Sequence, residues 1–170
     1  EHMESPSDFL SHLVKHLSEG GHIALSVPDC EHSIRTGDVS MLMHEHWNYY
    51  TSRTLRNSIR TSVGLDVHTQ GSSFGGALYA IAHRTSNASV VNKPDIDQEI
   101  RSLLNYRRLV RKRISRFLEY LEEAARKSES VGIYVPGRAI NALFLARDNV
   151  DLSMIRFFDD NQVLHGTYFP

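Results

Sequence analysis

Residues 5–28 read SPSDFLSHLVKHLSEGGHIALSVP, and this stretch decides the fold class of the chain. Ser5 followed by Pro6 is typical of a helix start, because a serine side chain caps the first turn and proline fits within it. Apolar residues then recur at helical spacing until Gly20-Gly21, where we predict the helix to end. Residues 22–27 (HIALSV) form a short apolar run closed by Pro28, which predicts a buried strand. A helix followed by a buried strand indicates part of an α/β layer, a fold that places ligands at strand ends.

The next sixty residues extend this layer. Residues 29–50 are expected to form a long irregular connection, a kind of segment that is often functional. Thr51-Ser52 is typical of a helix cap, and Gly64 marks the end of that helix. Residues 65–69 and 77–83 are predicted to be strands, and we expect them to pair antiparallel at the end of the sheet.

The second half of the chain begins with a polar linker and the longest helical pattern, from Asp95 to about Lys127. Residues 131–135 and 155–158 are predicted strands on either side of a helix at 139–146. This order is that of a nucleotide-fold βαβ unit. As a dinucleotide site the pattern is weak, because Gly137 is the only glycine in the turn and no GxGxxG motif occurs.

A basic outer face accompanies the long helix. A solvated surface explains it most simply, and a phosphate-binding role is the alternative. The side chains concerned are Arg101, Arg107, Arg108, Arg111, Lys112, Arg113 and Arg116.

Composition sets the broad class. The 170 residues are 41% hydrophobic and 23% charged, with a net charge of −1, so nothing global favours nucleic acid as a partner. The single cysteine, Cys30, excludes an internal disulfide and suits a reducing compartment. No apolar run approaches the roughly 18 residues of a membrane span. We therefore expect a cytoplasmic protein with no membrane and no nucleic-acid partner.

Residues 41–50 (MLMHEHWNYY) carry the main candidate site, because His44, Glu45 and His46 stand in a row. Imidazole changes its charge near neutral pH and carboxylate below it, so such a trio can move a proton or hold a polar ligand. Two other interpretations stay open. The histidines can be structural groups packed under Trp47, or the trio can ligate a metal. Without a second ligand cluster, we predict no metal site.

Motifs along nearly the whole chain resemble the C-terminal portion of deoxysugar-type C-methyltransferases, which depend on S-adenosyl-L-methionine (SAM). In the first half the likeness rests on Glu1-His2-Met3, Pro6, Phe9-Leu10, Gly20-Gly21, His44-Glu45-His46 with Tyr50-Thr51, and Gly75-Gly76-Ala77-Leu78. In the second half it rests on residues 133–141 (IYVPGRAIN) and 158–170 (FDDNQVLHGTYFP), which resemble an appended C-terminal domain. An added tag is the alternative origin of Glu1-His2-Met3.

The resemblance implies an α/β fold in three parts. Residues 1–86 resemble the end of a class I methyltransferase Rossmann-like sheet, and residues 87–128 a linker with a long helix. Residues 129–170 resemble a second, small and incomplete Rossmann-like βαβ domain. In this family the cofactor-binding glycine loop and acidic residue belong upstream of Glu1, so we expect this chain alone to bind SAM weakly or not at all. A fragment of a larger protein, or a divergent relative without cofactor binding, fits this pattern.

The resemblance also implies a reaction, the C-methylation of a nucleotide-linked keto sugar or similar small molecule. A base removes the proton beside the carbonyl, and hydrogen-bond donors stabilise the resulting oxyanion. By resemblance His46 is the expected base. Glu45 is expected to orient it or to bind sugar hydroxyls, and His2 to hydrogen-bond the keto oxygen.

A further proton-relay group is a tyrosine in some members of the family, where this chain has Met43. Either His44 or Tyr49 is expected to replace it, or the substrate differs. Tyr49 and Tyr50 are expected to bind the substrate. The alternative function is a non-catalytic Rossmann-like module that binds nucleotide sugars or serves as a scaffold and lacks SAM binding. The pattern does not predict an oligomeric state.

Overall fold

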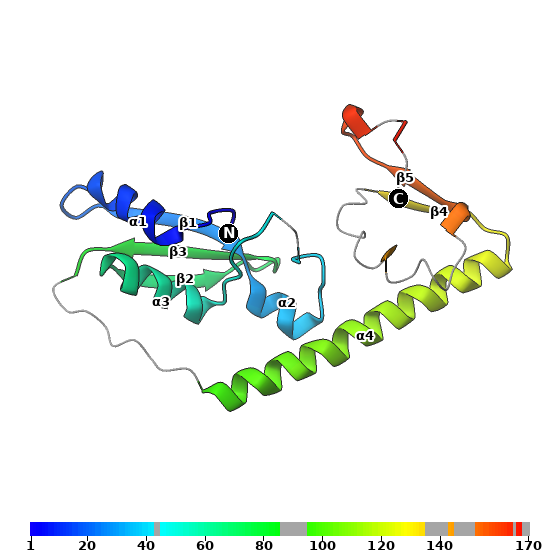
Figure 1. Ribbon diagram of the computed structural model, residues 1–170, viewed down its shortest axis with the longest axis horizontal. Coiled ribbons are helices and arrows are strands. Elements are labelled where there is room, and N and C mark those ends of the chain that lie inside the picture. Colours follow the sequence, from blue (N-terminus) through cyan, green and yellow to red (C-terminus); the bar gives the residue numbers. More distant parts are fainter. Residues whose placement is uncertain (43–44, 86–94, 135–142, 145–151, 165, 168–170) are drawn as a thin grey trace. The chain divides into compact units, whose positions relative to one another are not determined.

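The computed structural model describes residues 1–42, 45–85, 95–134, 143–144, 152–164 and 166–167 (Figure 1). The chain divides into two compact units, Glu1–Tyr106 and Arg107–Pro170. Each unit contains a small sheet and its own cluster of buried hydrophobic side chains. The predicted α/β class is therefore confirmed.

The first unit is built on a three-stranded sheet with the order β1-β3-β2. Its strands are β1 (His22–Pro28), β2 (Asp66–Gly71) and β3 (Ala77–His83). The central strand β3 runs antiparallel to both neighbours, so β1 and β2 run parallel to each other. The antiparallel pairing predicted for the last two strands is confirmed, because Asp66 pairs with His83 and Gly71 with Leu78.

Helices α1 (Pro6–Lys15) and α3 (Ser52–Val63) begin at the predicted caps. The Ser5 side chain accepts a hydrogen bond from the amide of Asp8 at the start of α1. At the start of α3, Thr51 and Thr54 form a reciprocal capping box. Gly64 ends α3 in the left-handed conformation that glycine adopts without strain.

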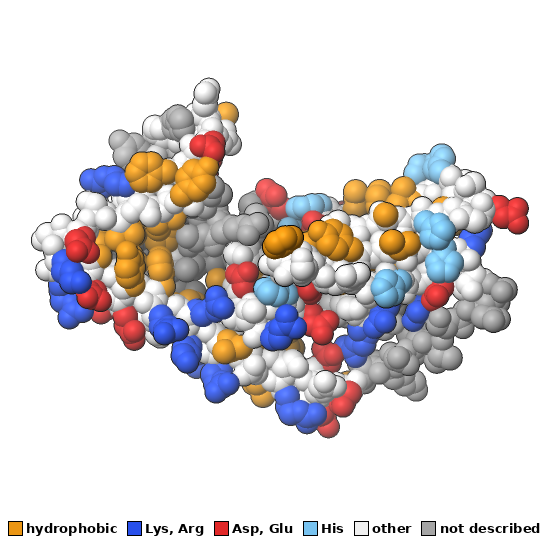
Figure 2. Space-filling view, turned by 180° about the vertical axis from the view of Figure 1, so that it is seen from behind, with side chains coloured by type: hydrophobic (Ala, Val, Ile, Leu, Met, Phe, Trp, Pro, Cys, Tyr) orange, Lys and Arg blue, Asp and Glu red, His pale blue; other side chains and the backbone are white. Residues whose placement is uncertain are grey.

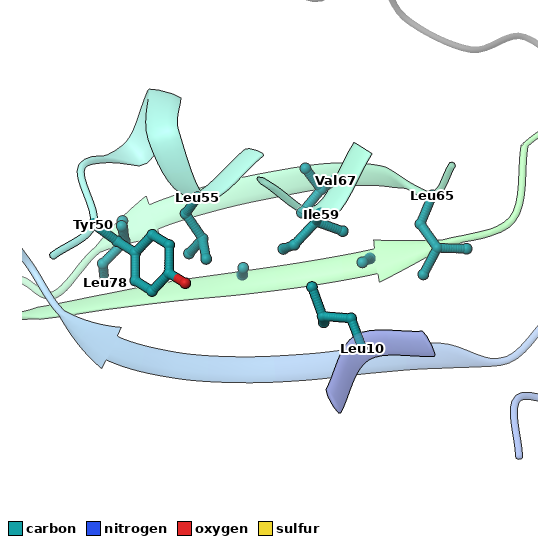
Figure 3. Close-up of a cluster of buried hydrophobic side chains, with 9 residues drawn as sticks. Leu10, Tyr50, Leu55, Ile59, Leu65, Val67 and Leu78 are labelled. Atoms are coloured by element: carbon teal, nitrogen blue, oxygen red, sulfur yellow. The ribbon is translucent and has the colours of Figure 1, made fainter. Parts of the chain in front are cut away.

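The core of the first unit lies between these helices and one face of the sheet (Figure 3). Ile59 of α3 is completely buried, and Leu55 lies one turn before it. These side chains point from α3 toward the strands, and Leu10 of α1 reaches the same cluster. The cluster consists of Leu10, Tyr50, Leu55, Ile59, Leu65, Val67, Leu78, Ala80 and Ala82. Burial of this one face holds the unit together.

The opposite face of the sheet is open. Tyr79 and Ile81 of β3 are 48% and 49% exposed, although Ala80 between them is buried. Histidine and hydrophobic side chains gather over this unit when the molecule is seen from behind (Figure 2). Strand β1 shows the same alternation, with every second residue from His22 to Ser26 exposed. The prediction of a buried strand at residues 22–27 is thus wrong, because only one face of the strand is covered.

Two local predictions need correction. The first helix ends at Lys15, with His16 as its C-cap, rather than at Gly20-Gly21. Residues 29–50 are not wholly irregular, because helix α2 (Cys30–Thr36) begins directly after β1. The Asp29 side chain caps α2, and Gly37 ends it in the left-handed conformation.

The second unit contains β4 (Val131–Tyr134) and β5 (Ile155–Phe158), which pair parallel as expected for a βαβ arrangement. Short 3₁₀ turns, η2 (Leu152–Met154) and η3 (Gln162–Leu164), flank β5. Of the helix predicted at residues 139–146, residues 143–144 are helical, and the other positions, with Gly137, lie outside the described residues.

The long helix α4 (Ile96–Arg126) confirms the strongest helical pattern of the sequence. In the second unit its last turns carry Leu121 and Ala124, which are buried in the core with Val131 and Ile155. Lys and Arg side chains follow α4 (Figure 2), and all seven residues of its basic face are exposed, which agrees with a solvated surface.

Candidate active site

The predicted site lies on the loop between α2 and α3, within residues 29–50, a segment that starts and ends near the carboxyl end of β1. The Cys30 amide, just after β1, donates a hydrogen bond of 3.0 Å to the Tyr50 carbonyl oxygen at the far end of the loop. The Asp29 amide donates to the Gly76 carbonyl oxygen at 3.1 Å and ties the same point to the turn before β3. The loop is therefore closed at its base, where α/β folds place ligands.

The first residues of the chain are fastened to this loop by backbone hydrogen bonds. The amides of Trp47 and Asn48 both donate to the Glu1 carbonyl oxygen, at 2.9 and 3.2 Å. The Asn48 side-chain amide donates to the Met3 carbonyl oxygen at 2.6 Å. Segments more than forty positions apart in the sequence are thus held side by side.

His2 and His46 meet at this junction. Their ring centroids are 4.9 Å apart, and the rings lie at 73° in an edge-to-face arrangement. Nδ1 of His46 lies 3.1 Å from the Met41 carbonyl oxygen, and Nδ1 of His2 lies 3.2 Å from the Glu45 carbonyl oxygen. A carbonyl only accepts hydrogen bonds, so in the neutral form each ring carries its proton on Nδ1. The lone pair is then on Nε2, the nitrogen available to accept a proton or to bind a ligand.

The other predicted site residues are placed differently. Glu45 is exposed, and its backbone carbonyl oxygen contacts Nδ1 of His2. Tyr49 is 41% exposed and lies edge-to-face with His46, with ring centroids 5.8 Å apart. Tyr50 is buried in the core. His44 lies outside the described residues.

A cavity of about 310 Å³ adjoins the site. Glu1 and His2 lie on its wall, and the buried Tyr50 and the nearby Ser58 contribute hydroxyl groups to an otherwise mostly apolar lining. The remaining lining residues are Met3, Pro6, Phe9, Leu10, Ala24, Leu25, Ser26, Val27, Leu55 and Ile59. His46 is not part of the wall and lies behind His2. The cavity offers apolar surface with a few polar groups, as small-molecule sites do.

Burial sets the protonation of two groups at the base of the loop. Loss of solvent raises the pKa of the Tyr50 phenol, and a hydrogen bond with Ser58 opposes this only in part. Burial likewise raises the pKa of the Cys30 thiol. Tyr50 is consequently a neutral hydrogen-bond donor, and Cys30 is an unreactive core thiol near neutral pH.

Two residues of the site, Glu1 and Asn48, were not predicted as site residues. The Glu1 carboxylate lies 3.5 Å from Nε2 of His2, and Asn48 holds the first residues in place. Asparagine in a loop has many ordinary roles, so its type carried no signal. Glu1 was part of a recognised motif, but only the folded chain shows that its carboxylate faces the histidines.

The fold and the site together define an α/β domain with a histidine and carboxylate cluster at the carboxyl end of a strand. Residues 1–70 match the family model described as a methyltransferase domain, and this range contains His2, Glu45 and His46. The match supports a methyltransferase-like function, and the α/β fold is consistent with a Rossmann-like methyltransferase. Methyltransferase domains generally use SAM. No curated protein matches the chain.

Within the described residues, no helix is both long enough and apolar enough to cross a bilayer. The long helix α4 carries the basic face described above and fails on apolarity.

Proposed function

We propose that this chain supplies the acceptor side of a SAM-dependent methyl transfer to carbon, with His46 as the general base. The substrate class we infer is a nucleotide-linked keto sugar or a similar small ketone. The observation that carries the proposal is the fixed orientation of His46, whose Nδ1 is held by the Met41 carbonyl oxygen 3.1 Å away. This leaves Nε2 as the basic nitrogen and points it away from its anchor.

The proposed chemistry begins with the carbon acid. Nε2 of His46 takes the proton from the carbon beside the ketone, and the electron pair of the broken C–H bond forms an enolate. The negative charge develops on the ketone oxygen, where a hydrogen-bond donor lowers the barrier. His2 lies on the cavity wall, beside His46, and is the side chain we assign to this oxygen. Its Nδ1–H is directed at the Glu45 carbonyl oxygen, so His2 donates to the ketone oxygen from Nε2 in its protonated form.

The surrounding residues bind and position the substrate in this proposal. Tyr50 and Ser58 present hydroxyl groups within the cavity, and Tyr49 covers one edge of the His46 ring. The exposed Glu45 side chain is assigned to the sugar hydroxyls. His44 and Tyr49 are the two candidate substitutes for the missing relay tyrosine.

The methyl donor is not assigned to residues of this chain. SAM supplies an electrophilic methyl group when bound. A glycine-rich turn between a strand and a helix is the usual cradle for such a cofactor. Within the described residues, the turn from β1 to α2 (Pro28 to Cys30) has no glycine. This turn therefore does not fit the donor, and our proposal covers proton removal and acceptor binding only.

Proton removal is testable without a methyl donor. In heavy water, the chain should catalyse incorporation of deuterium beside the ketone of a nucleotide-linked keto sugar, detected by mass spectrometry. A panel of keto sugars linked to uridine, thymidine and guanosine diphosphates covers the proposed class. General-base catalysis is typically worth about 10²–10⁴-fold, so His46→Ala should lower the exchange rate by about that factor.

The matched control is His12→Ala, since His12 is an exposed histidine on α1 outside the site. It should exchange deuterium at the wild-type rate. Equal rates for His46→Ala and wild type would refute the base assignment. Binding of a keto sugar without any exchange would instead support the non-catalytic module that binds nucleotide sugars.

A further inference from the structure

Three pairs of histidine rings lie close together in the described residues of the first unit. The centroid distances are 4.9 Å for His2 and His46, 5.1 Å for His12 and His16, and 5.4 Å for His22 and His83. Two imidazoles alone make a weak metal site, so a third ligand decides between the pairs. In the described part of the chain, only the first pair has a carboxylate within reach, that of Glu1.

The three side chains converge on one point. One potential ligand atom from each of Glu1, His2 and His46 lies within 4.8 Å of the other two. Zinc binds imidazole nitrogen and carboxylate oxygen at about 2.0–2.2 Å, so ligand atoms around it are about 3–3.5 Å apart. The trio therefore has to contract by about 1 Å or slightly more. His2 is more than half exposed at its side chain and has room for this movement.

Ring orientation is a second and independent observation. Histidines that bind metals usually donate their other ring N–H to a carbonyl or carboxylate, which fixes the tautomer and the ring direction. Both histidines of the trio already have this arrangement, with Nδ1 on the carbonyl oxygens of Met41 and Glu45. Among the described hydrogen bonds, no such anchor appears for His12, His16, His22 or His83.

We propose that Glu1, His2 and His46 bind a divalent transition-metal ion of the zinc class. Two nitrogens and one carboxylate oxygen suit such borderline ions better than calcium or magnesium, which prefer oxygen alone. Three protein ligands leave a fourth tetrahedral position open to water or a substrate oxygen. From the sequence we predicted that His44, Glu45 and His46 do not form a metal site. The proposed site differs from that trio, because Glu1 and His2 join His46 as ligands.

The site has a consequence for the reaction, and this part rests on the proposed function. A metal ion and a substrate proton compete for the same lone pair on Nε2 of His46. Saturating zinc should therefore abolish the deuterium exchange assigned to His46, and a chelator should restore it.

Metal binding itself is measured on the 170-residue chain without any substrate. Zinc affinity is obtained by calorimetry, and cobalt(II) reports tetrahedral geometry through its visible absorption. Glu1→Gln, His2→Ala and His46→Ala should each weaken zinc binding by about tenfold or more. The double variants His12→Ala/His16→Ala and His22→Ala/His83→Ala should bind as tightly as wild type. Circular dichroism verifies that each variant is folded.

Two results would overturn the site. One is a zinc affinity in His46→Ala or Glu1→Gln equal to that of the wild type. That result would mean that the terminal amine and His2 alone chelate the ion, since neither substitution affects those two groups. The other is loss of binding in either control pair. The base role fails separately: a chain that binds zinc at the trio but exchanges no deuterium keeps the metal site and loses the proposed function.

Discussion

Replacement of Ile59 by alanine tests how the core holds the acceptor cavity. Ile59 is completely buried between α3 and the sheet, and it also lines the cavity beside the site. Ile81 provides a matched control, because the same residue type is 49% exposed on the opposite face of the sheet. Both substitutions remove the same three carbon atoms.

The expected effects differ because the burial differs. Three buried carbon groups at about 0.8 kcal/mol each correspond to about 2.4 kcal/mol of lost transfer free energy. A cavity in a packed core adds to this, and buried isoleucine-to-alanine changes cost about 2–5 kcal/mol in total. We expect Ile59→Ala to lower the free energy of unfolding by about 3.5 kcal/mol. Ile81→Ala should cost about 1 kcal/mol, since half of its surface is already in water and no cavity forms.

Urea unfolding followed by far-ultraviolet circular dichroism measures both values. The dependence of the unfolding free energy on urea concentration should be the same for the two variants, so the midpoints alone report the difference. An Ile81→Ala variant as unstable as Ile59→Ala would refute the assignment of an open sheet face. It would show that the face carrying Tyr79 and Ile81 is covered.

Three further predictions concern the turn before β3, alkaline pH and the loop. Gly75 and Gly76 both have φ of +76°, but a Cβ at Gly75 would lie 2.5 Å from the His32 ring, whereas Gly76 has open space. We expect backbone strain to lower the free energy of unfolding of both alanine variants by about 1–2 kcal/mol, and that of Gly75→Ala by about 1 kcal/mol more. His32→Ala should remove this additional loss. Equal urea midpoints for the two glycine variants would contradict the contact with His32. Burial raises the pKa of Cys30 and Tyr50 above their ordinary values of 9.0 and 10.0, so the folded state holds these protons more tightly. The free energy of unfolding should therefore be fully retained below pH 9.0 and fall as the pH rises through the raised pKa values. In urea titrations from neutral to alkaline pH, the double variant Cys30→Ala/Tyr50→Phe should show a smaller fall. Finally, Asn48→Ala removes the hydrogen bond to the Met3 carbonyl oxygen, which is worth about 1 kcal/mol. The Trp47 amide hydrogen should therefore exchange with solvent about fivefold faster. The control Asn57→Ala on α3 should leave that exchange rate unchanged.

Local chemistry explains which elements were predictable from the sequence. Thr51 and Gly64 mark the ends of α3 because a hydroxyl cap and a left-handed glycine are short-range features. Strand β3 (Ala77–His83) has the predicted bounds, and α4 begins and ends within about one residue of its pattern. Helix α2 was missed although Asp29 and Gly37 carry cap signals, because its seven residues are too few for a clear apolar period.

Exposure and long-range contacts were beyond the reach of sequence patterns. An apolar run such as residues 22–27 is equally compatible with a strand covered on one face or on both. The contact of His2 with His46 joins segments more than forty positions apart in the sequence, and periodicity says nothing about such pairs. The sequence made residues 44–46 the candidate site, but only the folded chain brings Glu1 and His2 to His46.

The proton position on the His46 ring is the most direct test of the proposed base. Long-range ¹⁵N–¹H correlation spectra of the histidine-labelled chain distinguish the two neutral tautomers. We expect the proton on Nδ1, donated to the Met41 carbonyl oxygen, and an unprotonated Nε2 beside His2. A neutral His46 ring with its proton on Nε2 would contradict both the base role and the anchor on Met41.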